Sequence, residues 1–150
     1  MKIFLGADHG GFQSKEALKS WLQDCEHEVV DCGAYELDPT DDYPIMAETV
    51  SRAVLADEQT SQPSVGILIC CSGGGMVIAA NKIAGIRAVE VFNEVSAQHA
   101  REHNNANIIS LSADWFDLDQ VKKTIQAFLV ANFTHEERHQ RRLQQISNLE

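Results

Sequence analysis

The sequence of 150 residues has no long hydrophobic run, little proline and few basic residues. Its apolar stretches fall far short of the roughly 20 residues that cross a bilayer, so we expect no membrane span. Lysine and arginine number 12 against 22 aspartates and glutamates, giving a net charge of −10. Such an acidic balance argues against nucleic acid as a partner. The sequence starts with a strand-like segment and shows no signal peptide pattern.

The four cysteines lack the spacing of a zinc site or of a C-x-x-C motif. Cys70 and Cys71 are adjacent, which suits a structural disulfide poorly. We therefore expect four free thiols in a reducing compartment, the cytoplasm. With 44% hydrophobic residues, the chain is long enough for one domain, residues 1–150, with a real core.

Apolar strand patterns alternate regularly with helix patterns, and the links between them are short. This alternation predicts an α/β fold, with a parallel sheet covered by helices on both faces. The last segment has little apolar content, which is typical either of a solvated surface helix or of an arm that packs on a partner subunit. The expected strands are 2–7, 27–32, 65–70, 86–92 and 107–111, and the expected helices are 11–25, 44–57, 74–83, 94–103, 117–131 and 135–150.

The most informative stretch is residues 66–75, GILICCSGGG, where a buried strand enters a glycine-rich turn before a helix. Such a turn offers unpaired backbone N–H groups to an anion. Here the turn adjoins the thiol of Cys70, a potential nucleophile or base, and this pairing indicates an enzyme. The stretch is neither a P-loop nor a dinucleotide fingerprint.

A second polar cluster, residues 8–11 (DHGG), follows the first strand. Ligands bind at the carboxyl ends of strands in such sheets, so the two clusters are expected to meet there. Taken singly, Asp8 and His9 could merely cap a loop, and the glycines could merely form a tight connection.

His99 and His103 lie four residues apart, on one helical face. No glutamate occupies the second position of an H-E-x-x-H motif and no third ligand is obvious, so we expect no metal. His103 is better interpreted as a polar group that faces the site. Arg138 and Arg142 also share one face. They could be solvated and paired with glutamates, or they could clamp a phosphate.

Together these motifs resemble the type B ribose-5-phosphate isomerases, whose wider family includes galactose-6-phosphate and allose-6-phosphate isomerases. The resemblance spans the whole chain. It implies a Rossmann-like three-layer α/β/α sandwich with a mostly parallel five-stranded sheet and a C-terminal helical arm. It also implies a sugar-phosphate substrate, no metal or other cofactor, and a homodimer with sites shared across the interface, possibly paired into a tetramer. The matching segments are 6–12 (GADHGGF), 42–44 (DYP), 66–70 (GILIC), 72–75 (SGGG), 79–82 (AANK), 85–88 (GIRA), 96–98 (SAQ), 103–104 (HN) and 138–142 (RHQRR).

The resemblance also implies roles for individual residues. Cys70 matches the base that moves a proton between two sugar carbons, and Ser72 assists proton movement at the sugar oxygens. His103 with Asp8 would open the furanose ring. The remaining assignments concern binding: backbone N–H groups of Cys71, Ser72, Gly73, Gly74 and Gly75 hold the enediolate, His9, Arg138 and Arg142 hold the phosphate, and Tyr43 and Asn104 line the sugar.

Met76 stands where some members of the family carry a catalytic glutamate, which leaves only the cysteine route. Two positions depart from the family pattern. Cys71 replaces the usual glycine beside the base, and Asp114 stands where members typically have an arginine that faces the phosphate. The resemblance implies a cofactor-independent isomerase that interconverts ribose 5-phosphate and ribulose 5-phosphate. The two departures leave a six-carbon phosphate or an unphosphorylated sugar as the alternative substrate. A sugar-phosphate-binding protein without catalysis is the alternative of a different class.

Overall fold

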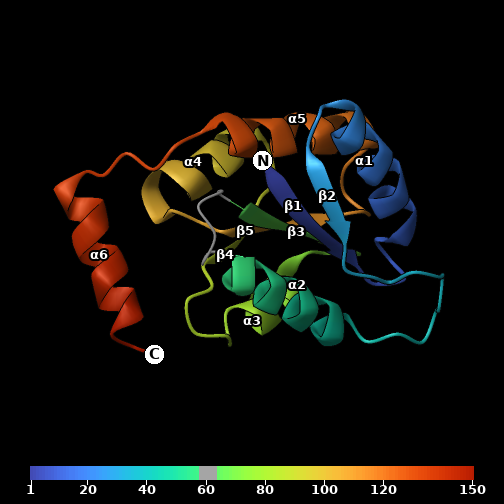
Figure 1. The fold of residues 1–150 in the computed structure, drawn as a ribbon, viewed down its shortest axis with the longest axis horizontal. Coiled ribbons are helices and arrows are strands. Elements are labelled where there is room, and N and C mark those ends of the chain that lie inside the picture. The colour runs from blue at the N-terminus through green and yellow to red at the C-terminus, as the bar shows by residue number, and fades with distance from the viewer. Residues whose placement is uncertain (58–63) are drawn as a thin grey trace.

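The computed structural model describes residues 1–57 and 64–150, in which five strands and six helices alternate (Figure 1). The expected α/β alternation is confirmed, and most element ends agree within two residues. The elements are β1 (Lys2–Ala7), α1 (Phe12–Asp24), β2 (Glu28–Asp31), α2 (Tyr43–Asp57), β3 (Ser64–Cys70), α3 (Gly74–Ala80), β4 (Ala88–Glu90), α4 (Glu94–Asn104), β5 (Ile108–Ser112), α5 (Leu118–Val130) and α6 (Glu137–Ser147).

The five strands form one sheet in the order β2-β1-β3-β5-β4. Every neighbouring pair is parallel, so the sheet is parallel throughout and not only mostly parallel as expected. From β1 the chain moves outward to the edge strand β2 and then returns to β3 on the other side of β1. The strand order therefore reverses between β1 and β3. A crevice outside the carboxyl ends of two such strands is the usual ligand site of this architecture.

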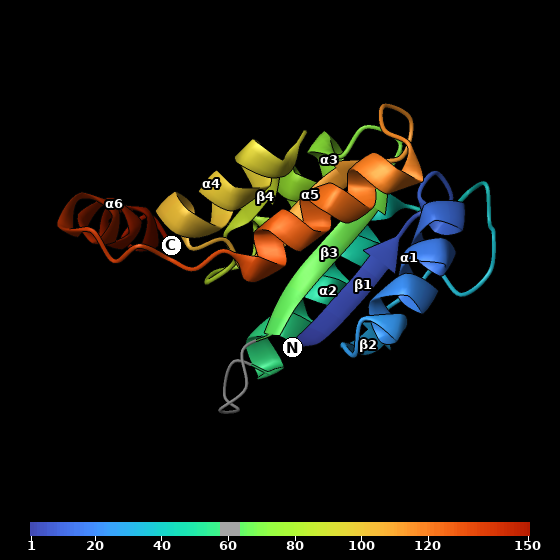
Figure 2. The same cartoon turned by 90° about the horizontal axis from the view of Figure 1, so that it is seen from above.

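Helices cover both faces of the sheet and create two hydrophobic cores (Figure 2). On one face, α1, α4 and α5 pack through residues such as Leu18, Ala100 and Phe128. On the other, α2 and α3 pack through Val50 and Met76. All seven residues of the central strand β3 are buried, as expected for a parallel strand covered on both sides. This packing fixes the carboxyl end of β3, where Cys70 lies.

The β4 strand is shorter than the expected 86–92. Ile86 and Val91 are buried, but the ladder to β5 pairs only residues 88–90. The apolar side chains of Ile86 and Val91 pack in the core without belonging to the ladder. Hydrophobicity alone therefore cannot show where strand pairing ends. Asn81 fixes the start of β4 instead, because its side-chain amide both donates to and accepts from the backbone of Ala88, at 2.9 and 2.8 Å.

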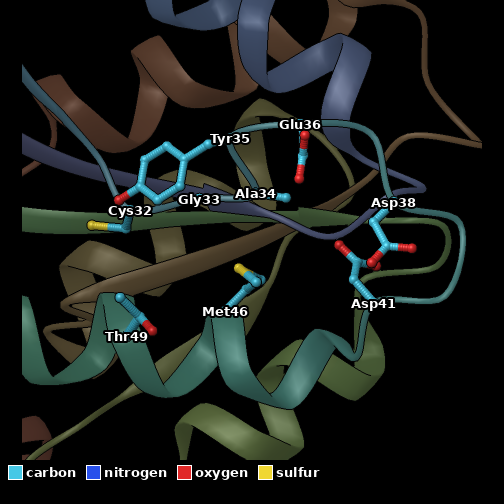
Figure 3. Close-up of a pocket in the computed structure, with 9 residues that line it drawn as sticks. All are labelled: Cys32, Gly33, Ala34, Tyr35, Glu36, Asp38, Asp41, Met46 and Thr49. Carbon is cyan, nitrogen blue, oxygen red and sulfur yellow. The ribbon is translucent and has the colours of Figure 1, made fainter.

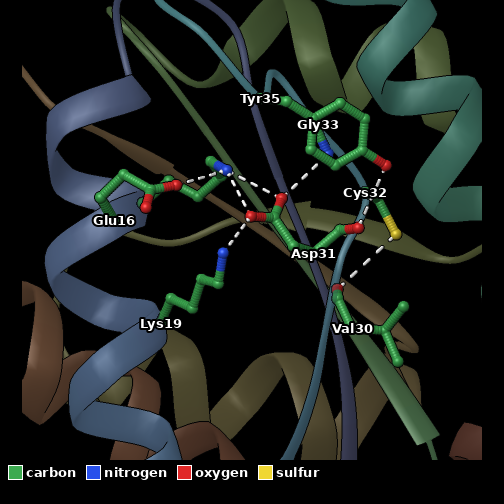
Figure 4. A network of polar contacts seen from close by, with 8 residues as sticks. Glu16, Lys19, Val30, Asp31, Cys32, Gly33 and Tyr35 are labelled. Atoms are coloured by element: carbon green, nitrogen blue, oxygen red, sulfur yellow. Dashed lines mark hydrogen bonds and ion pairs between the residues drawn. The ribbon is translucent and has the colours of Figure 1, made fainter.

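A network of ion pairs around Asp31 fastens α1 to the end of β2 (Figure 4). The Lys15 ammonium group is fully buried and lies 2.8 Å from both Asp31 Oδ1 and Glu16 Oε1. Lys19 reaches Asp31 Oδ2 at 2.6 Å, and the backbone N–H of Gly33 donates to Asp31 Oδ1 at 3.0 Å. A buried ammonium group is tolerated only when it is paired. Its pairing with Asp31 therefore holds the end of β2 against α1, and the loop that follows β2 starts from this fixed point.

The last helix, α6, stands apart from the sheet, beyond the final turn of α4 (Figures 1 and 2). It is anchored through His139, whose ring is buried and lies parallel to the His103 ring at a centroid distance of 4.7 Å. The sequence therefore predicted this arm correctly as a largely exposed helix. None of the helices in residues 1–57 and 64–150 is long and apolar enough to cross a membrane.

Candidate functional site

The turn after β1 holds a buried carboxylate and a partly exposed imidazole. Asp8 Oδ1 accepts a hydrogen bond from the Gly11 N–H at 3.2 Å, and burial raises the pKa of Asp8. His9 Nδ1 lies 2.6 Å from Asp41 Oδ1, which also accepts the His9 backbone N–H at 3.0 Å. This hydrogen bond raises the pKa of His9, with a further contribution from the charge of Asp8. Because these neighbours favour the cationic form, the partly exposed imidazole is suited to face an anion.

Cys70 ends β3 with its thiol buried beneath the glycine-rich turn. Its Sγ accepts a hydrogen bond from the Gly73 N–H at 3.0 Å. Burial raises the pKa of this thiol, and the charge of Asp8 adds to the rise, while the N–H groups of Gly73 and Ser72 oppose it. The turn therefore favours the thiolate, although it does not outweigh burial. All four cysteines are free thiols, as expected.

Gly73 gives the turn its shape. Its φ of +93° lies in the left-handed region, which side chains rarely adopt. A Cβ built there would lie 3.0 Å from Oε1 of Glu90, at the end of β4, so the carboxylate packs directly against the turn. The Gly73 carbonyl accepts a hydrogen bond from Ser110 Oγ at 2.9 Å. These contacts hold the Gly73 N–H toward the Cys70 thiol.

Cys71 and Asp114 form one rim of the site. The Cys71 side chain is exposed and lies against Gly10, where any side chain would collide with its Sγ. The Asp114 N–H donates to the Cys71 carbonyl at 3.3 Å, and that carbonyl also accepts from Ser112 Oγ. Burial raises the pKa of Cys71, and the Asp114 charge raises it further. Asp114 is thus exposed yet electrostatically coupled to the turn.

Tyr43 and Ser72 complete the group at this end of the sheet. The Tyr43 ring, in the first turn of α2, lies so close to Gly75 that a Cβ there would be 2.8 Å from its Cζ atom. Gly75 is therefore needed for close packing. Ser72 is exposed above the buried thiol. The structure thus brings together the predicted residues of the β1 turn, of the glycine-rich turn and of the start of α2.

Beside His9 lies a hollow of about 500 Å³, between the loop after β2 and the start of α2 (Figure 3). Asp41 on its rim is nearly buried, and its Oδ2 has no hydrogen-bond partner among the described residues. Three carboxylates line the hollow, which makes it unsuitable for a phosphate. Its lining residues are Cys32, Gly33, Ala34, Tyr35, Glu36, Asp38, Asp41, Met46 and Thr49.

The other predicted residues gather around the end of α4. This helix starts in a capping box between Asn93 and Ser96 and stops at Asn104, because Asn105 adopts a left-handed conformation with φ of +43°. His103 is half-buried in its last turn, and its ring stacks between His99 and His139. Asn104 faces a small hollow of about 220 Å³ that is partly lined by α6.

Both predicted arginines are exposed on α6, beside this helix end. Arg138 Nε pairs with Glu136 Oε2 at 2.8 Å. Arg142 has no ion pair within residues 1–57 and 64–150. An exposed pair like that of Arg138 contributes little stability, so its guanidinium group can exchange to a stronger anion.

The residues at the carboxyl ends of β1 and β3 form one group, and the residues around the end of α4 form another. These two groups lie at opposite ends of the molecule. The helix α4 begins after the carboxyl end of β4 and returns to the amino end of β5, so its last turn is remote from Cys70. Figure 2 shows α6 beyond α4, on the opposite side of the molecule from α1, which begins just after Asp8 and His9. One copy of the chain therefore cannot bring His103 to Asp8.

Sequence reasoning missed three residues that the structure places in or beside these groups. Asp41 is the partner of His9, and Glu90 packs on the glycine turn. Neither carries a periodic signal, because one lies in an irregular loop and the other at a strand end. Glu102, by contrast, was detectable, since it stands three residues after His99 and one before His103.

Residues 3–146 match the family model described as Ribose/Galactose Isomerase. Among curated relatives, ribose-5-phosphate isomerase B of Escherichia coli is 39% identical over 149 residues, covering 99% of this chain and 96% of that protein. The protein of the same name from Mycolicibacterium paratuberculosis is 35% identical over 150 residues, covering 100% and 92%.

Solved structures agree with this match. Ribose-5-phosphate isomerase B of Clostridium thermocellum superposes with a TM-score of 0.92 at 37% identity, covering 99% of this chain and 97% of that one. The Mycoplasma genitalium enzyme with bound ribulose-5-phosphate gives 0.90 at 37% identity, covering 99% and 95%. At this identity and coverage the likeness concerns the whole chain and not only its fold.

Proposed function

The chain belongs to the ribose/galactose isomerase family, and from that premise we propose that it interconverts ribose 5-phosphate and ribulose 5-phosphate. The observation that carries the proposal is the buried Cys70 thiol, hydrogen-bonded to the Gly73 N–H at the switch point of the sheet. The structure of a relative with bound ribulose-5-phosphate supports the substrate class.

In the proposed reaction, Cys70 acts as the single base. Its thiolate removes the proton from C2 of the open-chain aldose, and the electron pair forms the C1–C2 double bond of an enediolate. The resulting thiol then returns a proton to C1, while a proton moves between the two sugar oxygens. One group must reach both carbons because the same proton is taken and given back. A thiol can do this once the adjacent N–H groups favour its thiolate.

The glycine-rich turn would stabilise the enediolate. Backbone N–H groups of residues 71–75 provide donors that are already in place and that no side chain obstructs. Ser72, exposed above the thiol, is suited to move the proton between the sugar oxygens. His9, whose cationic form is favoured by the hydrogen bond to Asp41, would bind the phosphate.

The ring-opening histidine and the arginines assigned to the phosphate would come from a second copy of the chain. Because His103, Asn104, Arg138 and Arg142 lie at the far end of the molecule, we infer a homodimer in which this end of one copy meets the Cys70 end of the other. His103 with the partner's Asp8 would then open the furanose ring, and the arginines would complete the phosphate site. The exposed α6, with its buried His139 anchor, is the arm that reaches across.

The position of Asp114 favours a second candidate within the same chemistry. Its carboxylate lies beside Cys71 and would repel a phosphate dianion. A sugar with a hydroxyl group at that place would suit this rim better. The alternative substrates are therefore six-carbon phosphates of the galactose or allose type and unphosphorylated aldoses.

Two experiments test the proposal. The first is a panel of aldose and ketose phosphates assayed for interconversion, in which no turnover with any sugar would leave only a binding protein.

The second experiment mixes the Cys70→Ala and His103→Ala variants and lets their subunits dissociate mildly and reassociate. Each variant alone should be inactive, but heterodimers would contain one intact site, restoring about a quarter of all sites after random pairing. Failure to restore activity, with heterodimers present, would contradict the shared site.

A further inference from the structure

We propose that His99, Glu102 and His103 form a binding site for a divalent transition-metal ion, and that its occupation inhibits the enzyme. The inhibition rests on the proposed function, because the metal would occupy the imidazole assigned to ring opening. Metal binding itself does not depend on that function. The site lies outside the proton-transfer chemistry, so the reaction itself still requires no metal.

The helix α4 brings the three side chains together. Their positions, i, i+3 and i+4, place them on one face of the helix. One ligand atom from each residue lies within 4.8 Å of the others. The helix is fixed at its start by the Asn93 capping box and at its end by Asn105, so the spacing is held by regular backbone. The backbone of the cluster is therefore preorganised, whereas the His99 ring, which stacks on the His103 ring at a centroid distance of 4.6 Å, must turn before both rings can bind one ion.

The donor set suits zinc and its neighbours. Two imidazoles and one carboxylate are a common three-residue set for Zn²⁺, and imidazole also suits Ni²⁺ and Cu²⁺. Ligands at about 2.1 Å from a tetrahedral ion lie roughly 3.4 Å apart, so atoms that are up to 4.8 Å apart need to approach by up to about 1.4 Å. His99 is exposed and Glu102 is half-buried, which leaves both free to adjust. The four-residue spacing of His99 and His103 is also that of the two zinc-binding histidines in H-x-x-E-H enzymes.

The surroundings leave these ligands available. Glu102 Oε1 accepts a hydrogen bond from Gln98 at 2.7 Å, which orients the carboxylate while its other oxygen can bind a metal. On the opposite face of His103, the buried His139 ring stacks in parallel and holds the imidazole in place.

The test is a calorimetric titration of the full-length protein with Ni²⁺, chosen because thiols compete less for it than for Zn²⁺. Wild type should bind about one ion per chain. His99→Gln should weaken binding by at least about ten-fold, since even loss of a group that only orients a ligand typically costs 10–100-fold. Glu102→Gln should also weaken it. The matched control is His135→Asn, which removes an exposed imidazole outside the cluster and keeps a residue that tolerates the positive φ at that position.

The same variants are then assayed for isomerisation with and without Ni²⁺. Wild type should be inhibited reversibly, with EDTA restoring activity, while untreated His99→Gln should be as active as wild type. Its inhibitory Ni²⁺ concentration should rise by the same factor as its dissociation constant. Equal Ni²⁺ affinity in wild type and His99→Gln would overturn the metal site, and binding without inhibition would overturn its effect on His103. Absence of activity in untreated wild type would refute the proposed function and leave the titration result unaffected.

Discussion

Replacing Gly73 with alanine tests how the glycine-rich turn activates the thiol. Gly73 has a φ of +93°, and its N–H donates to Cys70 Sγ at 3.0 Å. The new Cβ would lie 3.0 Å from Glu90 Oε1, a flexible carboxylate that can move aside. The main effect is therefore backbone strain, which rotates the peptide and carries the N–H away from the sulfur.

Two free energies set the expected size of the effect. A non-glycine residue in the left-handed region costs roughly 1–2 kcal/mol. For a chain of this length, that strain lowers the melting temperature by about 2–8 °C. A hydrogen bond to a charged group contributes roughly 1.5–3 kcal/mol. Its loss from the thiolate would slow proton abstraction by about 10- to 100-fold, since 1.4 kcal/mol corresponds to ten-fold in rate.

The assay measures kcat and KM for ketose formation from ribose 5-phosphate, alongside thermal unfolding. Gly74→Ala is the matched control, because its φ is not positive and its Cβ would make only an ordinary contact with Glu90, at 3.5 Å. We expect kcat to fall strongly for Gly73→Ala and by less than about two-fold for Gly74→Ala. A Gly73 variant that loses stability but keeps wild-type kcat would refute the role of its N–H. Equal loss in both variants would show that any added methyl group harms the turn.

Four further predictions concern the same site. Cys70→Ala should abolish turnover with the fold intact by circular dichroism, while Cys71→Ala keeps most activity; if Cys71→Ala were the inactive variant, the base would be misassigned. Because burial and the charge of Asp8 raise the pKa of Cys70, the active thiolate increases with pH, so kcat/KM should rise up to about ten-fold per unit between roughly pH 7 and 9, and a flat profile would contradict a thiol base. Arg142→Ala should raise KM about ten-fold, with a smaller effect on an unphosphorylated analogue, because it removes a charge-assisted hydrogen bond; equal effects on both would show that it does not bind phosphate. Asp114→Arg should lower KM for ribose 5-phosphate severalfold if the carboxylate repels phosphate, and an unchanged KM would place Asp114 outside the site.

The elements were predictable because each carries a repeated signal. The strand at Lys2–Ala7 was predicted without error, and α1 within one residue at each end, since buried strands and amphipathic helices are periodic in hydrophobicity. The error at β4 has a physical cause: Val91 is as buried as a paired residue, yet its position follows the end of the ladder. Burial and strand pairing are separate properties, and the pattern of apolar residues in the sequence indicates only burial.

The sequence predicted a set of candidate residues but not their arrangement in space. Motifs identify Cys70 and His103, and only the path of α4 shows that they lie at opposite ends of one chain. Asp41 was missed because its contact with His9 joins two irregular loops. Glu102 was missed for a different reason: it directly precedes the second histidine, whereas the glutamate of an H-E-x-x-H motif follows the first. The roles of these residues stay predictions until the variants are measured.

In the proposed homodimer, the separation of the two residue groups would also make the enzyme sensitive to its own concentration. If each site needs both ends of the molecule, a dissociated subunit has no complete site, and specific activity would fall on dilution below the dissociation constant of the pair. Substrate bridging the two subunits would oppose this loss, because a ligand that binds only the assembled form stabilises it by mass action. Progress curves started from dilute enzyme would then show a lag that shortens as sugar phosphate is added beforehand.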